Sequence, residues 1–142
     1  MTIEEQLVKH EGLRLLPYKD TVGKLTIGVG RNLDDVGISL NEAMLFLDND
    51  IKRVKAELDT ALPWWRTLDT VRQQVMIDLG FNLGVLTPVG KAKLLTFTQT
   101  LALIQNGKYV EAANHLATLP WHKQVGIRAT DLETMLRTGI SA

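Results

Sequence analysis

The sequence contains no cysteine among its 142 residues. A disulfide framework and a thiolate metal site are therefore excluded, and the chain is compatible with folding in a reducing cytosol. Its three histidines, His10, His115 and His122, do not have the spacing of metal ligands. There is also no glycine-rich phosphate loop and no serine elbow. We expect neither a metal site nor a cofactor.

An excess of charge of either sign is also missing, since 16 basic residues balance 16 acidic ones. The basic footprint of a nucleic-acid-binding protein is absent, so no nucleic-acid partner is expected. Residues 1–59 carry eight lysines and arginines against eleven acidic residues, and residues 60–142 carry eight against five. A mildly positive second part could face an acidic polymer, but scattered solvated charges account for the same numbers.

No apolar run approaches the roughly 20 residues of a membrane-spanning helix. The first six residues are acidic and amphipathic, without the basic start and apolar stretch of a secretory signal. We expect no stable membrane insertion. With 45% hydrophobic residues, the chain can nevertheless bury a substantial core.

Apolar residues recur at helical spacing over most of the chain. Ser39 and Glu42 form a capping box that begins a long helix, which ends before Pro63. The helical pattern resumes at Thr67, and Gly80–Gly84 interrupts it. A further helix is expected after a second capping box at Thr96 and Gln99. Two more are expected over residues 108–118, up to a break at Pro120, and over residues 127–137.

The clearest strand signal is Leu25–Val29, which is flanked by glycines. Because side chains alternate along a strand, Thr26, Gly28 and Gly30 share one face. We expect this face to be open, lined by one hydroxyl and bare backbone, and therefore suited to form the floor of a sugar site.

Two carboxylates lie near this strand on different elements. Glu11 ends a helix predicted over residues 3–12, and Asp20 stands at the mouth of a turn. Two carboxylates that face a common gap are what glycoside hydrolysis requires. We expect the leucines of residues 13–16 to bury Glu11 partly, which would favour its protonated form, as would the C-terminus of a helix. Taken singly, Glu11 also fits a surface acid, and Asp20 fits the cap of an Asx turn.

Residues 10–30 resemble the phage-type lysozymes, the endolysins of T4-like phages. Their signature is an E-G-x-R-L helix end followed by a Y-x-D-x-x-G-x-x-T-I-G-x-G hairpin. The matching residues are Glu11-Gly12, Arg14-Leu15, Tyr18, Asp20, Gly23, Thr26-Ile27-Gly28 and Gly30.

The resemblance implies a mostly helical α+β fold of the lysozyme type. A single domain would span residues 1–142, with a small β-hairpin lobe at about residues 13–38 and helical parts at residues 1–12 and 39–142. The long helix after Ser39 would join the lobes, and a cleft would lie between them.

The same resemblance assigns roles to individual residues. Glu11 would be the general acid, and Asp20 with Thr26 would position water or stabilise positive charge. Arg31 stands where many relatives have histidine. The substrate-binding residues would be Gly30, Arg31, Phe81, Asn82 and Gln124, and Arg128 would supply supporting charge near the acid.

By resemblance, the protein would hydrolyse the β-1,4 bond between N-acetylmuramic acid and N-acetylglucosamine in peptidoglycan glycan strands. It would be a monomer that accumulates in the host cytoplasm and reaches the wall once a holin permeabilises the membrane, which lyses the host. Three alternatives stay open: a lytic transglycosylase, a relative that cleaves chitin or chitosan, and a wall-binding module without catalysis.

Overall fold

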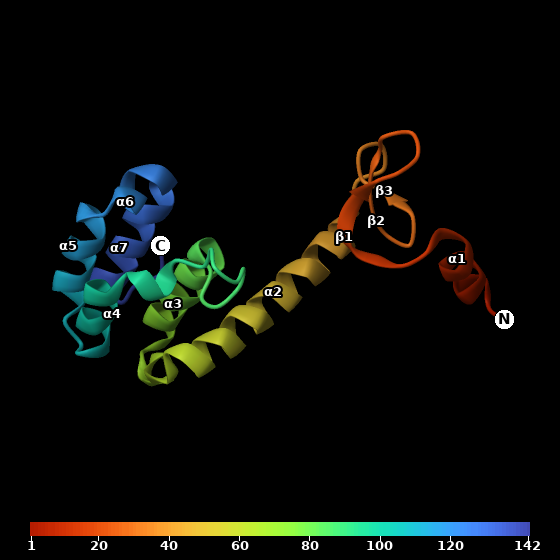
Figure 1. The fold of residues 1–142 in the computed structure, drawn as a ribbon. Coiled ribbons are helices and arrows are strands. Elements are labelled where there is room, and N and C mark those ends of the chain that lie inside the picture. The colour runs from red at the N-terminus through yellow and green to blue at the C-terminus, as the bar shows by residue number, and fades with distance from the viewer. The chain divides into compact units, whose positions relative to one another are not determined.

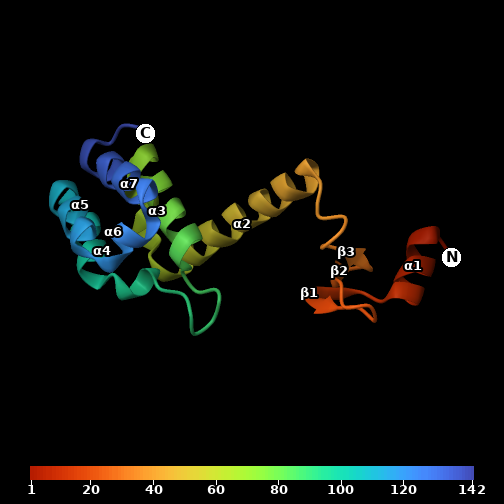
Figure 2. The ribbon, with the colours of Figure 1, turned by 90° about the horizontal axis from the view of Figure 1, so that it is seen from above.

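The structure, a computed structural model, describes the whole chain from Met1 to Ala142. Seven α-helices, two short 3-10 helices and a small three-stranded sheet near the N-terminus confirm the predicted mostly helical α+β class. The chain divides into two compact units, Met1–Leu47 and Asp48–Ala142, and the boundary falls inside helix α2 (Leu40–Ala61). Figures 1 and 2 show α2 as one unbroken helix. The cleft expected between the two lobes stays a prediction.

Helix α1 (Ile3–Glu11) lies in the first unit. The hydroxyl of Thr2 accepts the N–H of Glu5, and the Glu5 carboxylate accepts the N–H of Thr2, which together form a capping box. The helix ends before Gly12, whose φ of +80° suits glycine. Glu11 is therefore the last residue of the helix, as the sequence predicts.

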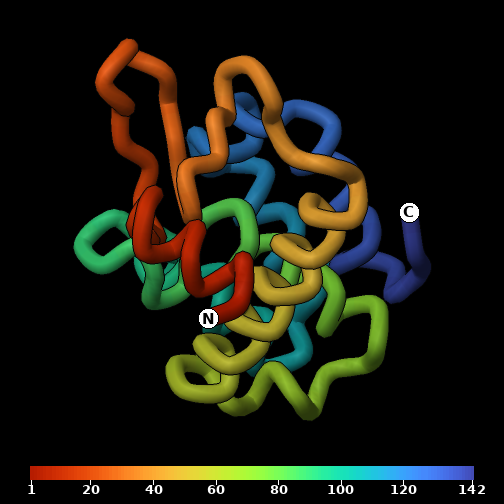
Figure 3. Tube along the Cα trace, turned by 90° about the vertical axis from the view of Figure 1, so that its right-hand side faces the viewer, coloured from red at the N-terminus to blue at the C-terminus, as the bar shows by residue number.

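The sheet of the first unit is antiparallel, with the strand order β1-β2-β3. The strands are β1 (Arg14–Lys19), β2 (Leu25–Gly28) and β3 (Arg31–Asn32), and the hairpin of β1 and β2 can be followed in Figure 3. Pro17 lies in the edge strand β1, where the register is irregular between Arg14 and Tyr18. An edge strand tolerates proline because its outer N–H groups have no ladder partner.

The second unit holds the apolar core. Besides the end of α2 it contains η1 (Pro63–Thr67), α3 (Thr70–Leu83), η2 (Leu94–Thr96), α4 (Thr98–Gln105), α5 (Tyr109–Thr118), α6 (Pro120–Val125) and α7 (Ile127–Thr138). Helix α7 packs against α3, α5 and α6, and α4 packs against α5 (Figure 1). Leu58, Trp65, Met76, Leu116 and Leu136 are fully buried in this core. None of the helices has the length and apolarity needed to cross a bilayer.

The capping box of Ser39 and Glu42 is confirmed by two reciprocal hydrogen bonds. The one expected at Thr96 and Gln99 is wrong. The Thr96 hydroxyl donates to the carbonyl of Lys93, and Gln99 bonds the ring of His115. Helix α4 instead begins after Phe97, without a side-chain cap.

Two further helix boundaries differ from expectation. Gly80 does not interrupt α3, because its missing side chain lets the helix pack closely: a Cβ there would lie 2.9 Å from methyl groups of Val54 and Val85. Pro120 does not merely end α5 but begins α6, where proline at the first position lacks only an N–H that would be unpaired anyway.

Candidate active site

Glu11 and Gly30 lie against each other in the first unit. Gly30 follows β2 with a φ of +66°, and a Cβ added there would lie 2.7 Å from Oε2 of Glu11 and 3.1 Å from its Cδ. The end of α1 and the turn between β2 and β3 thus meet at this carboxyl group. Only glycine leaves the space that the carboxyl group occupies.

Asp20 and Thr26 are joined through the backbone of Lys24. Oδ1 of Asp20 accepts the N–H of Val22 at 3.0 Å and that of Lys24 at 2.8 Å, which is an Asx turn. The Thr26 hydroxyl donates to the carbonyl of Lys24 at 2.9 Å, and the N–H of Asp20 donates to the same oxygen. The backbone N–H and carbonyl of one residue, Lys24, therefore hold both side chains, and Oδ2 of Asp20 makes no hydrogen bond within the protein.

Two expected environments in this unit are wrong. Glu11 is exposed, and Leu13, Leu15 and Leu16 do not bury it, since their own exposures are 60%, 81% and 78%. Leu15 and Leu16 lie in the edge strand β1, where the register is irregular. The strand face with Thr26 is not open either, because Thr26 is only 3% exposed in the middle strand, paired with Tyr18 and Asn32.

Arg31 has a structural role in the first unit. Its two terminal nitrogens bond the two carboxylate oxygens of Glu42 at 2.9 and 2.7 Å, and one of them also donates to the carbonyl of Gly37. This fork ties β3 to the first turn of α2. The hydrogen bond from Arg31, those from Ser39 and the Arg31 charge lower the pKa of Glu42 to about 2. Contact of Arg31 with substrate stays a prediction.

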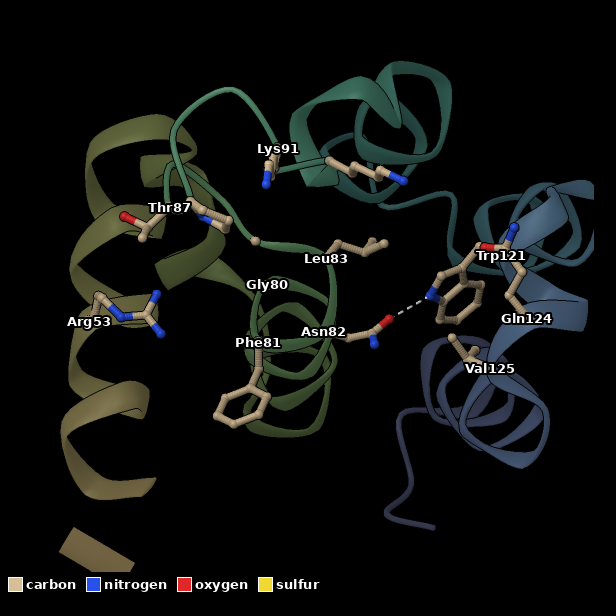
Figure 4. Close-up of a pocket in the computed structure, with 13 residues that line it drawn as sticks. Arg53, Gly80, Phe81, Asn82, Leu83, Thr87, Lys91, Trp121, Gln124 and Val125 are labelled. Atoms are coloured by element: carbon tan, nitrogen blue, oxygen red, sulfur yellow. Dashed lines mark hydrogen bonds between the residues drawn. The ribbon is translucent and has the colours of Figure 1, made fainter. Parts of the chain in front are cut away.

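A pocket of about 460 Å³ in the second unit brings together three of the residues expected to bind substrate, Phe81, Asn82 and Gln124. Phe81 and Asn82 come from the last turn of α3, and Gln124 comes from α6. In Figure 4 the side-chain amide of Asn82 points toward the indole ring of Trp121. Nε1 of Trp121 donates to Oδ1 of Asn82 at 2.9 Å.

One wall of this pocket is the loop 84–93 between α3 and η2, which contributes Thr87, Pro88 and Lys91. The carboxylate of Glu57 on α2 accepts the N–H groups of Leu86 and Thr87 at 2.7 and 2.8 Å. Burial opposes the charge of Glu57, but these hydrogen bonds and the charge of Arg53 prevail and hold its pKa below the usual value. The loop is thereby fastened to α2.

Sequence reasoning missed Trp121, Lys91 and Lys93, which also line the pocket. A tryptophan next to a proline most often covers a core, and Trp121 is only 3% exposed, so residue type and neighbour do not mark it as a pocket residue. The two lysines flank Ala92 in a stretch without acidic residues, between residues 79 and 110. That local charge imbalance was the signal that could have pointed to them.

Arg128 lies apart from the 460 Å³ pocket, on α7. Its Nε is 3.2 Å from Oδ1 of Asp78 on α3, and both side chains are half-buried. Burial raises the pKa of Asp78 above its usual value, the charge of Arg128 opposes this, and the charge of Asp131 adds to it. Within its unit Arg128 is therefore paired with an acid. Its support of the catalytic acid stays a prediction.

The chain matches the family model described as phage lysozyme over residues 8–136. It belongs to the phage lysozyme family. The matched region includes Glu11, Asp20 and Thr26 as well as the pocket of the second unit. The family makes the chain a lysozyme-like cell-wall hydrolase, and it implies peptidoglycan as the substrate. No group of three or more histidine or acidic side chains is placed to hold a metal ion.

Three curated proteins illustrate the range of similar sequences. The probable T4-type lysozyme 1 of Dictyostelium discoideum is 26% identical, over 97% of this chain and 95% of its own length. The pre-baseplate central spike protein Gp5 of Enterobacteria phage T4 is 25% identical, over 98% of this chain but only 28% of its own. The SAR-endolysin of Escherichia phage Mu is 32% identical, over 64% of this chain and 53% of its own.

Proposed function

We propose that this phage lysozyme is a muramidase that hydrolyses the β-1,4 bond between N-acetylmuramic acid and N-acetylglucosamine. The observation that carries the proposal is the arrangement of the first unit. One carboxyl group, that of Glu11, lies against Gly30 at a helix end, and a second, that of Asp20, lies in the hairpin with an unbonded oxygen. Two carboxyl groups on separate elements match the needs of glycoside hydrolysis.

In this mechanism Glu11 donates a proton to the glycosidic oxygen as the bond to the leaving sugar breaks. Oδ2 of Asp20 accepts a proton from the attacking water or stabilises the positive charge that develops on the sugar. Thr26 holds the position of Asp20 through Lys24, since its hydroxyl and the Asp20 carboxylate bond opposite ends of the Lys24 backbone. A carboxylate that is already held in position lowers the barrier more, because it need not be ordered before the reaction.

The test compares three variants on purified peptidoglycan, with the soluble products identified by mass spectrometry. Glu11→Gln should release reducing muropeptides about 10²- to 10⁴-fold more slowly, because it removes the proton donor. Glu4→Gln is the matched control, since Glu4 is an exposed acid of the same helix without a bonded partner. Asp20→Asn keeps the Oδ1 acceptor of the Asx turn but loses the charge, and it should also be slow.

A lytic transglycosylase is the second candidate, and one observation favours it. Oδ1 of Asp20 is occupied by the two turn hydrogen bonds, so Asp20 also fits a purely structural role. Such an enzyme forms an internal anhydro bond and uses no attacking water. Products that end in anhydro-muramic acid, together with an Asp20→Asn variant of full activity, would establish this alternative and exclude the hydrolase.

Products also separate the remaining possibilities. Release of soluble products from chitin oligomers but not from peptidoglycan would indicate a chitin-cleaving relative. Binding to insoluble wall without released fragments would indicate a binding module.

For the biological role we propose host-cell lysis by an endolysin that reaches the wall through a holin. Expression in a host with and without a co-expressed holin tests this. Lysis in both cases, or in neither, would contradict it.

A further inference from the structure

The pocket of the second unit is lined by three cationic side chains, Arg53, Lys91 and Lys93, and by no acidic one. The charge of Arg53 is balanced, because its guanidinium lies 3.3 Å from Asp50 and 3.4 Å from Glu57. Neither lysine makes an ion pair. Two uncompensated positive charges therefore border a concave site.

The remaining polar groups of the pocket also offer hydrogen-bond donors. Because Oδ1 of Asn82 accepts the Trp121 indole N–H, the Asn82 amide is held in one orientation. Its NH₂ group makes no hydrogen bond within the protein, so both donors are free (Figure 4). A site with ammonium and amide donors suits a ligand that presents several acceptor oxygens.

The lysines are carried by a loop that is fixed rather than free. Glu57 holds the N–H groups of Leu86 and Thr87, the N–H of Lys93 donates to the carbonyl of Leu83, and the N–H of Leu94 donates to that of Gly84. A fixed loop presents its charges with a small loss of conformational entropy on binding. The volume of about 460 Å³ lies in the range of sites for small ligands.

We propose that Lys91 and Lys93 bind a carboxylate of the glycan substrate and so make the enzyme prefer carboxylate-bearing glycan over neutral glycan. This inference rests on the proposed muramidase activity. Every muramic acid carries a lactyl group that ends in a free carboxylate or in a peptide with carboxylates of its own, whereas chitin has neither. The shared chemistry is a carboxylate, and its source is decided by experiment.

The experiment measures initial rates at low ionic strength, where exposed charge pairs are least screened. The substrates are peptidoglycan, the same material with its carboxylates converted to methylamides, and glycan stripped of peptides by an amidase. The test variant is Lys91→Met/Lys93→Met. The control is Lys108→Met/Lys123→Met, which changes the net charge equally at two exposed lysines that lie outside the pocket and make no ion pair.

Wild type should cleave peptidoglycan with a kcat/KM about tenfold above that for the methylamide, as expected for a charge-assisted contact at a partly exposed site. The effect should lie in KM. In the Lys91→Met/Lys93→Met variant the ratio of kcat/KM for peptidoglycan to that for the methylamide should fall to about one, and the control should keep the wild-type ratio. In peptide-bearing units the lactyl carboxylate is an amide, so this preference for peptidoglycan reports the peptide carboxylates. If stripped glycan, whose lactyl carboxylates are free, is also preferred over the methylamide, the site binds the lactyl carboxylate as well; if it is not, the site selects the peptide carboxylates.

Equal rates on peptidoglycan and methylamide for wild type would overturn the inference and leave the muramidase proposal intact. So would a preference that survives in the Lys91→Met/Lys93→Met variant. Absence of release from all three substrates by wild type would instead overturn the proposed function, and this inference with it. Thermal melting of each variant establishes that the fold is unchanged.

Discussion

The Cβ that any side chain would add to Gly30 would lie 2.7 Å from Oε2 of Glu11. The position of the carboxyl group at the end of α1 is thus set by bare backbone at the turn between β2 and β3. A contact this short leaves no room for a methyl group. Either the backbone or the Glu11 carboxyl group would have to move.

Gly30→Ala should therefore reduce wall hydrolysis more than it reduces stability. A positive φ costs a non-glycine residue about 1–2 kcal/mol, while displacement of a catalytic group by about 1 Å can cost on the order of 10²-fold in rate. Gly37→Ala is the matched control, because Gly37 has the same φ of +66° and its Cβ would meet nothing within 4 Å.

Both variants should lose similar stability in urea unfolding, but only Gly30→Ala should lose activity beyond the fraction unfolded. Equal activity of the two variants would show that the contact with Glu11 does not position the acid.

The Arg31–Glu42 ion pair should stabilise the fold in a pH-dependent way. The pKa of Glu42 is lowered from 4.5 to about 2 by the hydrogen bond from Arg31 together with those from Ser39. A lowered carboxyl pKa stabilises the folded state above the unfolded value and loses this effect as the pH falls through the folded value. Arg31→Met should therefore be less stable than wild type by a constant amount at pH 5–7, and the difference should shrink between about pH 4.5 and pH 2.

Urea unfolding across this pH range measures the difference. Lys9→Met, an exposed charge on α1 without an ion pair, is the control and should show no comparable change. A destabilisation by Arg31→Met that persists undiminished at pH 2 would mean that packing of the arginine stem, rather than its charge, holds β3 to α2.

The sequence was sufficient for most of the helices and for the Asx turn of the first unit. Apolar periodicity and caps such as Ser39 with Glu42 are local features, so they determine where most helices begin and end. The motif that contains Glu11, Asp20 and Thr26 is also local, since it spans only residues 11–30. The structure confirms the predicted Asx turn of Asp20, and the catalytic role of Asp20 stays a prediction.

Features that depend on distant partners could not be predicted. Gly80 looked like a helix break because its contacts with Val54 and Val85 come from other segments. The exposure of Leu15 and Leu16 depends on which segments pack beside β1, and no pattern along the strand reveals this. The pocket joins residues more than 30 positions apart, and the Asn82–Trp121 hydrogen bond that shapes it has no local signal.

Glu57 should keep the loop 84–93 in place. Its carboxylate accepts two backbone N–H groups from the loop, those of Leu86 and Thr87. Glu57→Ala should lose about 1 kcal/mol of stability and speed hydrogen exchange at those two amides. Glu57→Gln keeps an acceptor oxygen but loses the pairing with Arg53, so its exchange should lie between those of wild type and Glu57→Ala. Unchanged exchange in Glu57→Ala would show that the backbone bonds of Lys93 and Leu94 hold the loop without it.

Trp121 should hold Asn82 in the orientation that leaves its amide donors free. Trp121→Phe removes the indole donor to Oδ1 of Asn82 but keeps an aromatic ring in a site that is only 3% exposed. The released amide can rotate, so binding of a carboxylate-bearing muropeptide should weaken, as titration calorimetry can measure. The variant should also lose about 1–3 kcal/mol of stability from the lost hydrogen bond.

Trp65→Phe separates these two effects. Trp65 is fully buried in the same unit, and its indole N–H donates to Oδ1 of Asp59 at 2.8 Å, away from the pocket. It should lose comparable stability and keep wild-type muropeptide affinity. In a double-mutant cycle, Trp121→Phe and Asn82→Ala should couple by about 0.5–1.5 kcal/mol in the free energy of unfolding, because each substitution removes the same hydrogen bond. Additive effects would mean that Trp121 supports the pocket by packing alone, and the Asn82 amide would then owe its orientation to the backbone of α3.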